Sequence, residues 1–108
     1  YVPNQSLKIK FPLRPELENP TGSTLGGMLA VYFDLVYGPF SYMVARGAAV
    51  SLDLNTTFIK PLITKKDEFV IVEAVLLNQS KSYILMEGKA YKPDGSLVAT
   101  STTRMQKL

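Results

Sequence analysis

A single carboxylate, Asp34, stands in the middle of the longest apolar run of the sequence, residues 28–40. If this run is helical, none of the residues three and four positions away from Asp34 carries a charge. A carboxylate among apolar groups is costly unless it has a partner or a chemical role. A helix edge that touches solvent, or a hydrogen bond to a backbone amide, would explain the pattern equally well. Asp34 is therefore a candidate acid–base or nucleophilic residue.

Two consecutive glycines, Gly26 and Gly27, precede this carboxylate. We expect them in the first turn of the same helix, where N–H groups have no intrahelical partner and the helix dipole favours negative charge. Glycine lets another group come close to the backbone, although a packing contact with a neighbouring strand would also account for the pair. The pair is not a phosphate-binding loop, because neither a G-x-G-x-x-G pattern nor a Walker lysine accompanies it.

The chain contains no cysteine and no histidine among its 108 residues. Disulfides, thiolate metal sites and a cysteine nucleophile are therefore excluded. Serine–histidine triads, cysteine–histidine dyads and histidine-ligated zinc sites are excluded as well, because each needs an imidazole. We expect neither a metal nor a cofactor. Without histidine, no side chain other than a carboxylate such as Asp34 is a conventional base at neutral pH.

One substantial helix is predicted over about residues 24–37. Ser23 or Thr24 is a suitable N-cap, and Gly38-Pro39 should stop or kink the helix. A less regular turn could continue over residues 40–45. Because the helix has no polar stripe, we expect it to lie inside a curled sheet rather than on top of it.

Five strands are predicted around this helix, over residues 7–13, about 50–58, 69–77, 82–91 and 97–105. In the second strand, apolar residues at 50, 52, 54 and 58 alternate with polar residues, which is the period of a half-buried strand. Residues 93–96, Pro-Asp-Gly-Ser, predict a hairpin turn between the last two strands. One strand, one helix and about four antiparallel strands indicate an α+β fold in a single domain over residues 1–108.

The overall charge and hydropathy narrow the range of partners. The net charge is +3 and the sequence pI is about 9.2, with basic residues scattered through the second half. A nucleic-acid binder more often has a clustered basic stripe, so no nucleic-acid partner is expected. Residues 28–40 fall short of the ~20 residues of a transmembrane helix, and the polar N-terminal stretch does not resemble a signal peptide. We therefore expect a soluble, cytoplasmic protein without membrane contact.

Several segments resemble one known family. Residues 19–27, N-P-T-G-S-T-L-G-G, followed seven residues later by Asp34, are similar to the N-x-x-G-x-x-H-G-G…D signature of hotdog-fold acyl-CoA thioesterases. The phenylacetate-degradation thioesterases and their thioesterase-superfamily relatives are the most similar group. Residues 50–61 resemble the V-S-x-D-x-N…F-x-x-P strand of the family, and residues 94–99 resemble its D-G-K-L-V-A hairpin. The likeness is collinear over roughly residues 15–108. It implies a hotdog fold, in which a curved antiparallel sheet of about five strands wraps one long central helix.

The resemblance implies an acyl-CoA thioesterase that hydrolyses a thioester to the free acid and CoA. Asp34 would be the general base or nucleophile, and the Gly26 N–H would stabilise the oxyanion. Asn19 and Ser51 would position water or the reacting group. Leu25 departs from the signature, because the family has at this position a histidine that orients the turn. This departure makes an acyl-CoA or acyl-ligand binding protein without hydrolysis the alternative, and a β-rich module unrelated to thioesters the third hypothesis.

The chemistry of a thioester does not require a histidine. Its leaving thiolate has a conjugate acid with a pKa near ~8.5, so it departs without strong general-acid help. A carboxylate and an oxyanion site at a helix terminus are therefore a sufficient minimal set. Amide hydrolysis would be much harder with these side chains.

The resemblance also implies where the substrate binds and how the chain assembles. The substrate-binding candidates are Gly27, Lys60, Lys81 and Ser82, and Arg104 is a further candidate for the CoA phosphates. The acyl pocket should be apolar and could use Met28, Tyr32, Tyr37 or Phe58. In the family the site is shared across a dimer interface, with the glycine turn of one subunit facing the aspartate of the other. We therefore expect a homo-oligomer, either a homodimer or a homotetramer built as a dimer of dimers.

Overall fold

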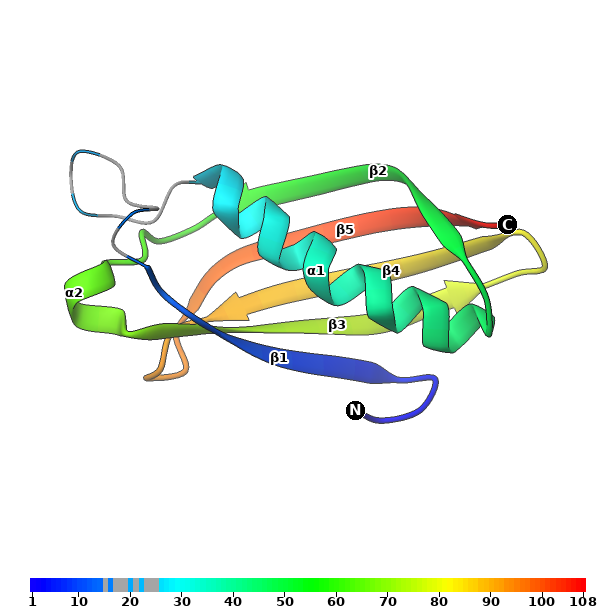
Figure 1. The fold of residues 1–108 in the computed structure, drawn as a ribbon, viewed down its shortest axis with the longest axis horizontal. Helices are drawn as coiled ribbons and strands as arrows, with labels where there is room; N and C mark the ends of the chain where they lie inside the picture. The colour runs from blue at the N-terminus through cyan, green and yellow to red at the C-terminus, as the bar shows by residue number, and fades with distance from the viewer. Residues whose placement is uncertain (15, 17–19, 21, 23–25) are drawn as a thin grey trace.

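A five-stranded antiparallel sheet packs along one side of a long helix in the computed structural model (Figure 1), which describes residues 1–14, 16, 20, 22 and 26–108. The elements in chain order are β1 Ser6–Pro12, α1 Gly26–Ala45, β2 Ala49–Phe58, α2 Thr64–Asp67, β3 Phe69–Gln79, β4 Tyr83–Tyr91 and β5 Leu97–Lys107. The strand order in the sheet is β1-β3-β4-β5-β2, so β1 and β2 are the two edges. The predicted α+β order and all five predicted strands are confirmed.

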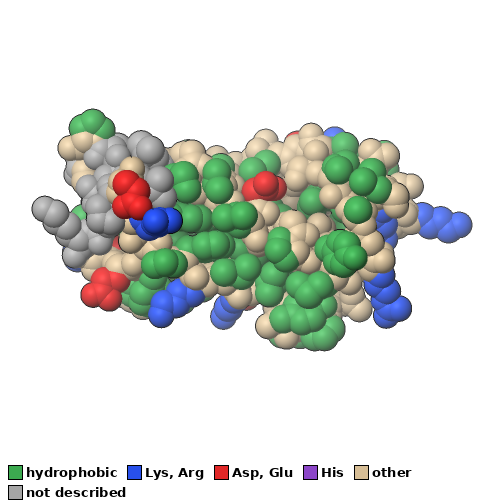
Figure 2. All heavy atoms as spheres, viewed as in Figure 1, with side chains coloured by type: hydrophobic (Ala, Val, Ile, Leu, Met, Phe, Trp, Pro, Cys, Tyr) green, Lys and Arg blue, Asp and Glu red, His purple; other side chains and the backbone are tan. Residues whose placement is uncertain are grey.

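The core lies between α1 and the inner face of the sheet. Burial alternates along β3 and β4, as expected for strands with one face on a core. Phe33, Val36, Tyr37 and Phe40 of the helix are fully buried there. The opposite face of α1 exposes Val31, Leu35 and Tyr42 at 44%, 51% and 62%. Figure 2 shows hydrophobic side chains gathered on the side of the molecule that carries α1. The sheet therefore covers the helix on one side only.

The helix continues through Gly38-Pro39 to Ala45, so the predicted stop after residue 37 and the predicted irregular turn over residues 40–45 are wrong. Pro39 removes one N–H from the helix, which normally disfavours an interior position. Burial of Phe40 and Ser41 beyond the proline holds the next turns against the sheet, and the Ser41 hydroxyl donates to the Gly38 carbonyl at 2.7 Å. The predicted N-caps, Ser23 and Thr24, lie outside the described residues.

The actual end of α1 is a Schellman turn. Gly47 N–H donates to the Tyr42 carbonyl at 3.2 Å, and Arg46 adopts the left-handed conformation with φ 55°. With 20 residues, α1 is by length and composition alone suited to cross a membrane, although the apolar run in the sequence is shorter. Its packing against the sheet is that of a core helix.

The hairpin predicted over residues 93–96 is confirmed. Lys92 N–H donates to the Ser96 carbonyl at 2.9 Å, and Gly95 has the positive φ of 90° that the turn requires. Asp94 accepts hydrogen bonds from the Ser96 N–H and hydroxyl, which lower the pKa of its carboxyl. Lys92 also pairs with the buried carboxylate of Asp67 at 3.3 Å. This ion pair ties the short helix α2, which the sequence did not predict, to the hairpin.

Gly88 on β4 is required by the packing of α1. A Cβ at this position would lie 2.5 Å from the Tyr37 hydroxyl and 2.8 Å from the Phe33 ring. We predict that Gly88→Ala lowers the free energy of unfolding by about 1–3 kcal/mol, because buried rings must shift. The control Gly27→Ala, at an exposed helical position with open space at the Cβ, should instead be neutral or stabilising by up to ~1 kcal/mol. Equal effects of the two substitutions in denaturant titrations would contradict this account.

The buried hydroxyls of Tyr37 and Ser101 lie near each other but make no hydrogen bond of good geometry within the part of the chain that the structure describes. Burial raises the pKa of Tyr37 from 10.0 to about 12, and the nearby Ser101 hydroxyl opposes this rise to a smaller extent. Because an unpartnered buried hydroxyl is costly, we predict that Tyr37→Phe raises the free energy of unfolding by about 1 kcal/mol at pH 7. The raised folded-state pKa adds stability below pH 10 that is lost as pH rises towards 12. Tyr37→Phe should therefore lose less stability than wild type between these pH values. The control is Tyr42→Phe, because Tyr42 is 62% exposed. A larger change in the free energy of unfolding for Tyr42→Phe than for Tyr37→Phe would contradict this prediction.

Candidate active site

Asp34 and Ser51 meet at the open side of the helix, where β2 forms the edge of the sheet. The Ser51 hydroxyl donates to Asp34 Oδ1 at 3.5 Å, and both residues are exposed. This distance exceeds the ~2.7 Å usual for O–H···O bonds, so the contact is a weak one. The carboxylate is held beside a hydroxyl and remains accessible to water or a ligand.

A β-bulge at Leu52 aims Ser51 at the carboxylate. Ser51 pairs with Met105 and Asp53 with Arg104, so Leu52 is an extra residue without an opposite partner. Met105 is buried on the helix side of the sheet, and Ser51 beside it therefore points to the helix side. The regular alternation predicted for residues 50–58 is wrong at this point, because the bulge reverses the faces before Asp53.

A hollow of about 340 Å³ opens beside the carboxylate. Asp34 and Ser51 line it together with the apolar side chains of Ala30, Val31 and Leu54. Helix α1 forms one wall and the inner face of β2 the other. An apolar hollow with one carboxylate at its side can hold an acyl group next to a base or nucleophile.

The glycine pair opens α1, as predicted. Gly26 packs on the ring of Phe58 at the end of β2, whereas Gly27 is exposed and has open space where a Cβ would stand. Asp34 lies eight residues further along the helix, which is about 12 Å along its axis. The Gly26 N–H and the Asp34 carboxylate of one chain therefore cannot reach the same carbonyl group, in keeping with the expectation that the two come from different subunits.

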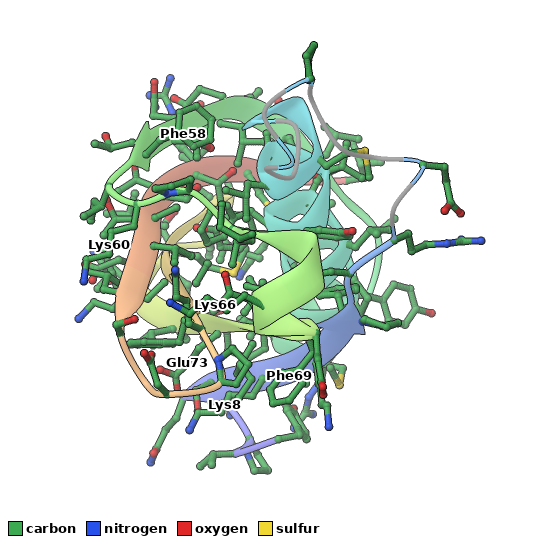
Figure 3. All side chains as sticks on the ribbon, turned by 90° about the vertical axis from the view of Figure 1, so that its left-hand side faces the viewer. Lys8, Phe58, Lys60, Lys66, Phe69 and Glu73 are labelled. Carbon is green, nitrogen blue, oxygen red and sulfur yellow. The ribbon has the colours of Figure 1, made fainter. Side chains whose placement is uncertain are left out.

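The predicted phosphate ligands are also far apart within the chain. Lys60 N–H donates to the Val98 carbonyl near the start of β5, and Lys107 N–H at the end of β5 donates to the Ser82 carbonyl. These points are about 30 Å apart along the strand. Lys60 therefore lies at the Phe58 end of the sheet (Figure 3), and the exposed Lys81 lies in the turn at the opposite end.

Arg104 lies away from the hollow. It neighbours the inward-facing Met105 on β5, so its side chain is on the helix-free face, where its Nε is 3.5 Å from Asp53 Oδ2. Of the predicted acyl-pocket residues, Tyr32 and Tyr37 are buried in the core and Met28 is half-buried against it. Asn19 and Leu25 lie outside the described residues.

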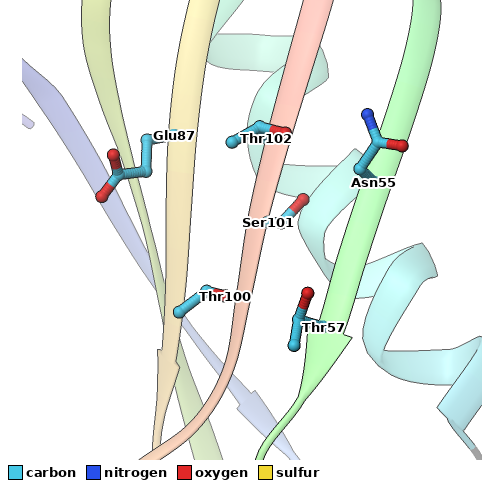
Figure 4. A pocket seen from close by; sticks show the side chains of 6 residues that line it. All are labelled: Asn55, Thr57, Glu87, Thr100, Ser101 and Thr102. Atoms are coloured by element: carbon cyan, nitrogen blue, oxygen red, sulfur yellow. The ribbon is translucent and has the colours of Figure 1, made fainter.

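A second hollow, of about 320 Å³, lies on the face of the sheet opposite α1 (Figure 4). Its lining is polar, from Asn55, Thr57, Glu87, Thr100, Ser101 and Thr102. The polar residues that alternate along β2 and β5 could have indicated a polar surface on this face, but they were not identified as a site from the sequence. No group of three or more acidic side chains in the described residues could hold a metal ion.

The thioesterase superfamily model matches residues 21–99. The chain belongs to the thioesterase superfamily. No curated protein matches the sequence. The predicted resemblance to hotdog thioesterases is therefore confirmed at the level of the family.

Solved structures share the fold of this superfamily member. AziG from S. sahachiroi has a TM-score of 0.92 at 19% identity over 100% of this chain and 87% of that protein. PaaI from the phenylacetic acid degradation operon of E. coli has a TM-score of 0.87 at 15% identity, over 95% of this chain and 72% of PaaI. A Streptococcus mutans protein bound to acetyl CoA has a TM-score of 0.87 at 14% identity, over 95% of this chain and 81% of that protein. These similarities confirm the predicted hotdog fold.

Proposed function

We propose that this protein hydrolyses acyl-CoA thioesters, with Asp34 as the general base or nucleophile. The observation that carries the proposal is the accessible Asp34 carboxylate beside Ser51 at an apolar hollow, in a chain of the thioesterase superfamily. Acetyl CoA bound to the S. mutans protein of the same fold supports an acyl-CoA ligand. A net charge of +3 suits the anionic CoA.

The reaction requires attack on the thioester carbonyl and release of a thiolate. As general base, Asp34 takes a proton from water while the water oxygen bonds to the carbonyl carbon. As nucleophile, its carboxylate forms an anhydride that water then hydrolyses. In both routes the C–S bond breaks, and the thiolate, whose acid has a pKa near ~8.5, leaves without a strong acid. The Gly26 N–H at the helix N-terminus stabilises the oxyanion.

Because Gly26 and Asp34 of one chain are too far apart to act on one thioester, the proposed site needs Gly26 from one chain and Asp34 from a second chain. A two-fold axis beside β2 would run the two α1 helices in opposite directions, so the glycine turn of one chain would face the Asp34 of the other. Strand β2 suits this pairing, because its 10 residues contain neither lysine nor proline and expose Val50 and Leu52. The other edge, β1, carries Lys8, Lys10 and Pro12, which protect a strand from pairing.

The same two-fold axis would bring together the predicted ligands of CoA. Lys60 of one chain, at the Phe58 end of the sheet, would approach the Lys81 and Ser82 turn of the second chain. Cationic side chains and exposed N–H groups at this junction would bind the phosphates of CoA. Gly27, exposed beside Gly26, would leave room for the reacting part of the substrate.

Binding without hydrolysis is the second candidate function, and Leu25 favours it. The family histidine at this position orients the glycine turn, and a leucine side chain has no hydrogen-bonding group that could take over this role. Such a protein would keep the acyl-CoA site and lack turnover.

We predict that wild type releases thiol from at least one of a panel of short, long and aromatic acyl-CoAs. Asp34→Ala and Asp34→Asn should lower kcat by about 10²–10⁴-fold, because a carboxamide neither accepts the proton nor attacks the carbonyl. The control Glu87→Gln, on the helix-free face, should retain activity. No thiol release with acyl-CoA binding retained would support the second function. Unchanged activity of Asp34→Asn would overturn the site assignment.

We predict that the protein is at least a dimer in solution and that thioesterase activity requires the dimer. Val50→Lys places a like charge on each copy of the β2 edge and should shift the mass to a monomer with at least tenfold lower kcat. The control Leu85→Lys changes a side chain of similar exposure, 41%, on β4 in the middle of the sheet, and should leave a dimer intact. A monomeric wild type with full activity would exclude the shared site. Light scattering and thiol release measure both properties.

A further inference from the structure

The ring of Phe58 abuts the first turn of α1 at Gly26. A Cβ at Gly26 would lie 3.2, 3.4 and 3.6 Å from Cζ, Cε2 and Cε1 of the ring. All three atoms belong to the outer edge of the ring. Gly26 is therefore a position where the absence of a side chain lets the helix terminus rest directly on an aromatic edge.

Phe58 is well fixed at its backbone although its side chain is partly free. Its residue is 55% exposed, so the ring gains only part of the stabilisation that full burial in the core would give. The strand pairs Phe58 with Ala99, and the next two N–H groups, of Ile59 and Lys60, both donate to the Val98 carbonyl at 2.8 and 3.1 Å. The ring thus projects from a rigid strand end (Figure 3).

The position of the ring relates it to the proposed site. Phe58 and Leu54 are an even number of residues apart on β2, so both side chains point to the helix side of the sheet. Leu54 lines the hollow beside Asp34 there. The helix terminus that rests on Phe58 is the one whose Gly26 N–H is the proposed oxyanion donor. An oxyanion donor acts only if it is held within a fraction of an ångström of its working position.

We propose that Phe58 is a positioning residue, which sets the height of the Gly26 N–H above the end of β2. This inference rests on the proposed thioesterase function. Because an oxyanion donor acts mainly in the transition state, loss of the ring lowers kcat and leaves KM nearly unchanged. A residue that only lined the acyl pocket would raise KM instead.

Two substitutions at Phe58 test the contact with Gly26, one by removing the contact atoms and one by adding an atom to the ring. Phe58→Leu removes all three contact atoms, and kcat should fall about 10-fold or more with KM within about 2-fold. Phe58→Tyr adds an oxygen at Cζ, the atom nearest Gly26, and should also lower kcat although the ring is kept. The control is Tyr83→Leu, an aromatic residue of similar exposure, 47%, on the opposite face, which should retain activity.

A double-mutant cycle decides between positioning and independent roles. Gly26→Ala alone forces its Cβ against the ring and should lower kcat, and Phe58→Leu should restore part of that loss in the double variant. The expected double variant is at least about 10-fold more active than the product of the single effects. Gly27→Ala, which has no neighbour within 4 Å, should show no such coupling with Phe58→Leu.

The outcomes separate this inference from the proposed function. Wild type that releases no thiol overturns the proposed function, and the positioning role with it. Active wild type with multiplicative effects at Gly26 and Phe58 overturns the positioning role alone. The same cycle in thermal unfolding, with coupling expected between Gly26→Ala and Phe58→Leu, tests the contact itself; independent shifts of Tm would overturn it.

Discussion

The burial of one face of α1 against the sheet is the interaction on which the rest of the structure depends. Phe33 and Tyr37 press on Gly88, where no side chain would fit, and the same face continues as Phe40 beyond the proline. This packing fixes the rotation of the helix about its axis. Asp34, next to Phe33 in sequence, is therefore held on the open side of the helix towards β2.

The site combines one rigid helix with the irregular edge of a sheet. Without the bulge at Leu52, Ser51 would point to the helix-free face and could not approach Asp34. The helix also separates the carboxylate from the Gly26 N–H by about 12 Å, so the two halves of the proposed site do not meet within one chain. A β2 edge without lysine or proline, beside an exposed apolar helix face, is consistent with completion of the proposed site by a second copy.

Local rules predicted most of the fold, and they failed where distant contacts override them. The five strands and the hairpin at Gly95 follow from period-2 burial and turn chemistry. The helix end did not, because Gly38-Pro39 is a strong local stop signal that the burial of Phe40 and Ser41 outweighs. The bulge at Leu52 was equally hidden, since an extra residue is defined only against the opposite strand.

The sequence by itself determined the chemistry that is available. Because the chain has no histidine or cysteine, the sequence predicted that a carboxylate in an apolar run and the glycines before it would serve the proposed thioester hydrolysis. Only the tertiary structure decided which groups share a place. It brought Phe58 against Gly26, set the 3.5 Å distance between the Ser51 hydroxyl and Asp34, and placed Lys60 and Lys81 at opposite ends of the sheet. The physical reason is that strand register and helix length set these distances, and neither can be read from residue types.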